Sequence, residues 1–161
     1  MDDLDALAAR VAAKLIARGE TIAVSESSAG GLISAALLAV PGASAFFMGG
    51  AVVYTATARE VLLGISPAEM CERGIRSASE PYAALCAARM RERFGTSWGL
   101  SETGAAGPAG NRYGDAAGHA CFALSGPVET VTTLETGHGD RPANMRVFAA
   151  AALALLERAL G

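Results

Sequence analysis

Residues 21–31, TIAVSESSAGG, have the pattern of a short strand that runs through a polar turn into a helix. The first four residues are β-prone and mostly apolar, which is typical of a buried strand. The turn would place Ser27 beside free backbone N–H groups at a helix N-terminus, where Gly30 and Gly31 let the main chain approach an anion or an oxyanion. We therefore expect the floor of a site here, with Ser27 as a candidate nucleophile. The alternative is that Ser27 or Ser28 merely caps the helix.

Helix and strand patterns alternate along the rest of the chain. Apolar spacing, capping residues and glycine stops predict helices at 3–18, 31–40, 57–63, from Ser66 onward, 79–94 and 142–160. Strands are predicted at 21–24, 46–54, 98–101, 118–124 and 128–134, the last two as a hairpin. Helical crossovers give parallel neighbours and hairpins give antiparallel ones. The pattern therefore predicts an α/β protein, a three-layer α/β/α sandwich with a mixed, mostly parallel sheet.

Composition narrows the range of functions. The chain has 161 residues, of which 52% are hydrophobic and 18% charged, so we expect a single domain over residues 1–161. A net charge of −3 without a basic stripe gives no support for a nucleic-acid partner. No secretory signal and no apolar run long enough for a bilayer are visible, so we expect a cytoplasmic protein with no membrane partner.

Cysteine and histidine give little support for a metal site. Cys71, Cys86 and Cys121 are odd in number and far apart, which fits neither a disulfide scaffold nor a zinc site, and we expect no metal and no cofactor. His119 lies in an apolar run and is expected to be a strand residue. His138 lies in a loop and is better placed for chemistry.

Four stretches, at 26–31, 54–64, 103–108 and 139–141, together resemble the C-terminal domain of the CinA family of nicotinamide-nucleotide amidases. The resemblance implies a three-layer α/β/α fold. It also implies hydrolysis of nicotinamide mononucleotide to nicotinate mononucleotide and ammonia, with a serine as nucleophile, a lysine as base and no metal. Six residues would bind the substrate: Glu26, Gly30, Gly31, Thr103, Gly104 and Arg141.

The catalytic residues of that family carry over only in part. Its serine falls on Ser27, and the tyrosine that opens its second motif falls on Tyr54. Its lysine is replaced by Arg59, and the one lysine in the chain, Lys14, is expected on the outer surface of the first helix. An arginine has a pKa above about 12 and cannot serve as a base. The lysine's role is therefore vacant.

Three hypotheses follow. In the first, the protein is an amidohydrolase with Ser27 as nucleophile, with Tyr54, Glu26 or His138 as base and with Arg59 stabilising negative charge. In the second, the domain is catalytically silent and binds a pyridine nucleotide or another anionic small molecule. In the third, it is a structural module that assembles through the apolar faces of its alanine-rich helices. We expect a small-molecule nucleotide as ligand and a homo-oligomer as assembly.

Overall fold

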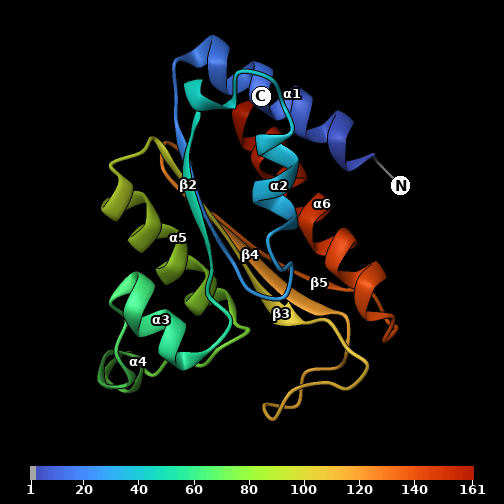
Figure 1. Ribbon diagram of the computed structural model, residues 1–161. Coiled ribbons are helices and arrows are strands. Elements are labelled where there is room, and N and C mark those ends of the chain that lie inside the picture. Colours follow the sequence, from blue (N-terminus) through green and yellow to red (C-terminus); the bar gives the residue numbers. More distant parts are fainter. Residues whose placement is uncertain (1–2) are drawn as a thin grey trace.

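A five-stranded sheet separates two helical layers in residues 3–161, the part of the chain that this computed structural model describes (Figure 1). One layer contains α1, α2 and α6, and the other contains α3, α4 and α5. The helices are α1 (Leu4–Arg18), α2 (Leu32–Leu38), α3 (Ala56–Leu63), α4 (Pro67–Arg73), α5 (Glu80–Phe94) and α6 (Arg141–Leu160), with a short 3-10 turn at Ala43–Ala45. The strands are β1 (Ile22–Glu26), β2 (Phe47–Val52), β3 (Trp98–Ala105), β4 (His119–Ser125) and β5 (Thr130–Glu135).

The strand order in the sheet is β2-β1-β3-β4-β5. Strand β1 pairs in parallel with β2 and β3, whereas β3 with β4 and β4 with β5 are antiparallel. Within the described residues, β4 alone therefore runs against the other strands. The predicted three-layer sandwich with a mixed, mostly parallel sheet is confirmed, and the helical crossovers lie between the parallel neighbours as expected.

Two hydrophobic cores hold the layers together. The larger lies between the sheet and α1, α2 and α6, and it includes Leu15, Trp98, Phe122 and Phe148, each fully buried. The smaller core lies under α3, α4 and α5 around Met90. Central strands β1 and β4 are buried along their whole length, whereas exposure alternates along the edge strands β2 and β5. This difference is expected for strands covered on both faces and for strands at an edge.

Most element ends follow the predicted signals. The Ser66 hydroxyl accepts from the Glu69 amide at 3.0 Å, with proline in the first turn of α4. The Ser79 hydroxyl accepts from the Tyr82 amide at 3.3 Å in the same way at the start of α5. The hydrogen bonds satisfy N–H groups that a helix N-terminus leaves unpaired, so the two caps are confirmed as local, sequence-encoded features.

Strand β3 differs from its prediction. The prediction ends it at residue 101, but the strand continues to Ala105. The reason is tertiary: Thr103 pairs with Cys121 and Gly104 with Ala120 on β4. A Cβ on Gly104 would collide with the backbone of β4, so glycine permits this close pairing.

Within residues 3–161, no helix combines the length and the apolar character needed to cross a membrane.

Candidate functional site

Five of the candidate site residues meet at the ends of strands β1, β2 and β3. Ser27 directly follows β1, Tyr54 lies just beyond β2, and Thr103 and Gly104 belong to the last residues of β3. Arg59 reaches the same place from α3. Together they line a cavity of about 230 Å³, called here the central cavity. The carboxyl ends of parallel strands are where open α/β sheets bind ligands.

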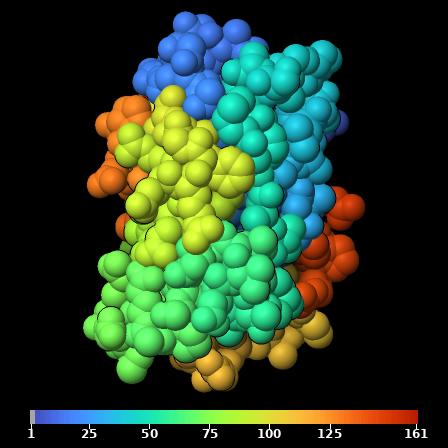
Figure 2. Space-filling view, turned by 60° about the vertical axis from the view of Figure 1, so that its left-hand side comes forward, coloured from blue at the N-terminus to red at the C-terminus, as the bar shows by residue number. Residues whose placement is uncertain are grey.

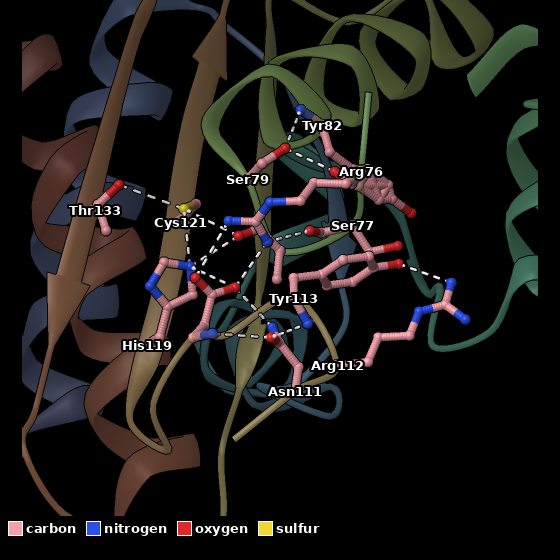
Figure 3. Close-up of polar contacts among 12 residues, drawn as sticks. Arg76, Ser77, Ser79, Tyr82, Asn111, Arg112, Tyr113, His119, Cys121 and Thr133 are labelled. Atoms are coloured by element: carbon pink, nitrogen blue, oxygen red, sulfur yellow. Dashed lines mark hydrogen bonds and ion pairs between the residues drawn. The ribbon is translucent and has the colours of Figure 1, made fainter. Parts of the chain in front are cut away.

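The central cavity has further walls that the sequence did not indicate. Two of them are Val53, just after β2, and Tyr82, in α5. Figure 3 labels Tyr82, Ser77, Asn111 and Tyr113. The other four are Ser77 and Ala78, in the segment before α5, and Asn111 and Tyr113, in the loop between β3 and β4. Neither segment has hydrophobic periodicity, so nothing local marked it as a wall. Tyr82 belongs to α5, and the packing of α5 on the sheet decides which side of this helix meets the cavity.

Arg59 is the cationic residue of the central cavity. Its Nε donates to the Tyr82 hydroxyl at 3.0 Å, and its Nη2 donates to the Ser77 hydroxyl at 2.6 Å. The guanidinium carbon lies 4.7 Å from the centroid of the Tyr82 ring. Burial raises the pKa of Tyr82, so this phenol stays neutral. No carboxylate among residues 3–161 forms an ion pair with Arg59, whose charge is therefore available to a ligand.

Arg141 lies beside a second, smaller cavity of about 180 Å³, which shares Tyr54, Gly104 and Asn111 with the central cavity. Its Nη1 donates to the Gly107 carbonyl at 2.6 Å, and its Nη2 donates to the Tyr54 hydroxyl at 3.0 Å. Arg141 thus lies next to the central cavity and is hydrogen-bonded to Tyr54, which lines that cavity.

Two buried carboxylates, Glu26 at the end of β1 and Glu102 on β3, accept hydrogen bonds from the turn after β1 and the start of α2. Glu26 accepts from the backbone N–H groups of Gly31, Ile33 and Ser34 at 2.8–3.1 Å. Glu102, on β3, accepts from three more donors, which are the backbone N–H of Ser27 at 3.1 Å, that of Ala29 at 2.8 Å and the Ser28 hydroxyl. The expectation of free N–H groups for an anion or oxyanion is therefore wrong, because two carboxylates of the chain itself already occupy them.

Three candidate residues serve the turn and lie outside the central cavity. Glu26 is 1% exposed, and its carboxylate accepts a hydrogen bond from a backbone N–H group in the first turn of α2. Gly30 and Gly31 have φ values of +67° and +101°, a backbone conformation that favours glycine. His138, a candidate base, is exposed in its loop and does not line the cavity either; its Nδ1 accepts from the Asp140 amide at 3.3 Å.

Glu102 was missed by the sequence reasoning. Burial raises its pKa to about 7, while the hydrogen bonds from Ser28, Ala29 and Ser27 oppose this shift and the neighbouring Glu26 adds to it. The signal in the sequence was a single acidic residue within a buried strand. Its partners are more than 70 positions away along the chain, so the fold alone reveals its role.

The walls of the central cavity suit binding better than proton transfer. Its described lining contains no lysine, histidine or carboxylate. Ser27 lines it, and its hydroxyl has no hydrogen-bond partner among residues 3–161. In the same part of the chain, His, Cys, Asp and Glu side chains form no group of three that could hold a metal ion. The arrangement offers a serine hydroxyl, a fixed guanidinium and three tyrosines.

The fold is thus a three-layer α/β/α domain with a serine turn and a cavity at the ends of its strands. The model of the CinA C-terminal domain matches residues 4–160, and the chain belongs to this family. A CinA-like protein of Anaeromyxobacter dehalogenans strain 2CP-1 is 40% identical over 156 residues, which is 97% of this chain and 38% of that protein. One of Synechococcus sp. strain CC9902 is 43% identical over 124 residues, 77% of this chain and 29% of the relative.

The chain thus spans about a third of the length of these relatives. Solved structures agree over the whole domain. The competence or damage-inducible protein of Enterobacter asburiae superposes with a TM-score of 0.91 at 30% identity, covering 100% of both chains. A CinA superfamily protein of Escherichia coli gives 0.88 at 28% identity, with 97% of this chain and 90% of that one covered.

Proposed function

We propose that the central cavity binds a pyridine nucleotide and that the domain does not hydrolyse it. This proposal rests on the position of Arg59 in the central cavity. It stands where the family resemblance places a lysine base, and Ser77 and Tyr82 fix it as a permanent cation in the cavity. Because a guanidinium cannot release its proton at ordinary pH, it attracts an anionic ligand and cannot activate Ser27.

The chemistry of the lining supports a nucleotide with a charged pyridine ring. Arg59 can form paired hydrogen bonds with a phosphate or carboxylate. Tyr54 lines the same space, its ring carries no arginine of the described residues, and an aromatic face attracts a cationic ring such as nicotinamide in a nucleotide. Nicotinamide mononucleotide, the substrate that the resemblance implies, is therefore the reference ligand.

Hydrolysis by an altered relay is the second candidate, and one observation favours it. Ser27 lines the cavity, and because its hydroxyl forms no hydrogen bond with residues 3–161, it is free to contact a bound ligand. Of the three bases considered, Glu26 has three backbone donors and His138 lies outside the lining. Tyr54 lines the cavity, and its hydroxyl accepts from Arg141.

Calorimetry and an assay of ammonia release distinguish silent binding from hydrolysis. We expect the wild type to bind nicotinamide mononucleotide and to release no more ammonia from it than Ser27→Ala does. Arg59→Gln should weaken binding at least tenfold, about 1.4 kcal/mol, because it removes the charge from the cavity. Arg59→Lys supplies a group that can lose a proton, and ammonia release by this variant should depend on Ser27.

A matched control is Arg158→Gln, which removes one charge from an exposed position on α6 and should leave affinity unchanged. Ammonia release by the wild type that disappears in Ser27→Ala would establish the altered relay in place of silent binding. If the wild type does not bind the nucleotide at all, the proposal fails, and the result supports the hypothesis of a structural module.

A further inference from the structure

A larger hollow adjoins the central cavity, and most of its lining residues lie outside the site described so far. It measures about 500 Å³ and shares Tyr54, Arg59, Ser77 and Tyr113 with the central cavity. Its remaining lining comes from α3, α4, the segment after α4 and the loop between β3 and β4: Ala56, Pro67, Met70, Ile75, Arg76 and Arg112. We call it the arginine groove. Figure 2 shows α3 and α4, in green, above the orange loop at the lower end of the molecule.

Positive charge dominates the groove. Arg59, Arg76 and Arg112 line it, and its lining contains no aspartate or glutamate. Arg76 is neutralised by Asp115, at 2.7 Å, whereas no carboxylate of residues 3–161 pairs with Arg59 or Arg112. Two guanidinium groups thus remain for a ligand, and guanidinium forks match phosphate oxygens in geometry and charge.

Tyr113 contacts Arg76 and Arg112, the two arginines of the groove that do not line the central cavity. The guanidinium carbons of Arg76 and Arg112 lie 5.1 and 5.0 Å from the centroid of its ring (Figure 3). Nη2 of Arg112 also donates to the Tyr113 hydroxyl at 3.0 Å. Because Tyr113 lines both hollows, its contacts hold the exposed Arg112 at their shared border.

Size and polarity indicate what the groove could take. Ligand pockets usually measure about 300–1,000 Å³. The central cavity falls below that range, and the groove lies within it. Pro67, Met70 and Ile75 give the groove an apolar part beside its guanidinium groups. An apolar surface next to phosphate-binding cations suits a base joined to a phosphate, as in the second half of a dinucleotide.

We propose that the arginine groove is the subsite for the second half of a pyridine dinucleotide. The pyrophosphate link lies between Arg59 and Arg112, and the second base lies on the apolar part of the groove. This assignment rests on the proposed function for the nicotinamide half, which occupies the central cavity. It makes the dinucleotide, and not the mononucleotide, the preferred ligand class.

Calorimetric titration with three probes tests the assignment: nicotinamide mononucleotide, nicotinamide adenine dinucleotide and inorganic pyrophosphate. The dinucleotide should bind the wild type at least tenfold more tightly than the mononucleotide. Arg112→Gln should remove most of this advantage and weaken pyrophosphate binding, while mononucleotide affinity stays within about twofold. Arg112 is exposed in a loop, so the variant should fold, and Arg158→Gln is the matched control for charge.

The outcomes distinguish this assignment from the proposed function. If the mononucleotide binds and the dinucleotide is no tighter, or if its advantage survives Arg112→Gln, the groove is not the subsite and the proposed function stands. If pyrophosphate binds through Arg112 but the mononucleotide does not bind, the groove is an anion site, and both the dinucleotide assignment and the proposed function fall. Binding of none of the three probes overturns both.

Discussion

At the scale of single residues, Glu102 couples the serine turn to pH. It is 2% exposed, and burial raises its pKa to about 7. In the unfolded chain a glutamate titrates near 4.3. Between these two values the folded protein keeps a proton that the unfolded chain has released, so the free energy of unfolding falls as the pH rises through this window. The full change is on the order of 3 kcal/mol.

Urea denaturation at pH 5 and at pH 8 tests this coupling. We expect the wild type to lose stability at the higher pH and Glu102→Gln, which cannot titrate, to lose much less. Glutamine keeps an oxygen that can accept from the Ser27 and Ala29 amides, so the variant should fold. Glu92→Gln, at an exposed position of α5, makes the same chemical change without burial and should behave like the wild type. Equal pH dependence of wild type and Glu102→Gln would contradict the raised pKa.

Residue roles that depend on contacts far along the chain could not be predicted. The sequence and its resemblance singled out Ser27, Arg59 and Thr103, which the fold brings to one cavity. Ser77 and Tyr113 were missed because they lie in segments whose own sequence forms no periodic pattern. They become walls only when α5 and β3 pack together, and no local signal records that packing.

At the scale of elements, helix caps show where local prediction works and where it fails. Ser66 and Ser79 cap α4 and α5 through residues three positions ahead, and their spacing in the sequence reveals them. Helix α2 begins differently. Its N-cap is Gly31, which has no side chain to offer, and the carboxylate of Glu26 from the end of β1 accepts the N–H groups instead. A cap supplied by the preceding strand is invisible to a rule based on helix spacing.

Replacing Glu26 by glutamine should therefore affect stability more than ligand binding. The buried carboxylate accepts three charge-assisted hydrogen bonds, and losing its charge should lower the free energy of unfolding by about 2 kcal/mol. Nucleotide affinity of the folded variant should stay within about twofold. Denaturation by urea and calorimetry measure the two quantities, with Glu92→Gln as control. Loss of binding with unchanged stability would instead make Glu26 a ligand contact, as the family resemblance implies.

At the scale of the whole molecule, His119 joins segments that are far apart in the sequence. It opens β4, and its Nδ1 contacts Glu135 of β5 at 2.5 Å. Its Nε2 lies 2.8 Å from the carbonyl of Ala78, a wall of the central cavity with φ +54°, and 3.6 Å from Asp115 in the loop after β3 (Figure 3). The Cys121 thiol lies 3.6 Å from the same nitrogen. One imidazole thus connects two strands and both loops that enclose the cavity.

This network predicts how the protein responds to alkaline pH. Burial by itself lowers the pKa of His119, but the contacts with Glu135, Ala78 and Asp115 outweigh it, and the pKa is raised. The charged ring therefore stabilises the fold fully below the unfolded pKa of about 6.5, and this contribution is lost as the pH rises through the higher folded value. Because Glu135 is half-exposed, its pair with His119 should contribute only about 1 kcal/mol.

Proton NMR can follow the two histidines of the chain separately, and we expect the His119 signal to titrate above pH 6.5 in the wild type. Glu135→Gln should move that midpoint to lower pH and reduce the stability lost between pH 6 and pH 9. Glu129→Gln, exposed just before β5, should change neither. A His119 midpoint that stays unchanged in Glu135→Gln would mean that the ion pair does not hold the proton.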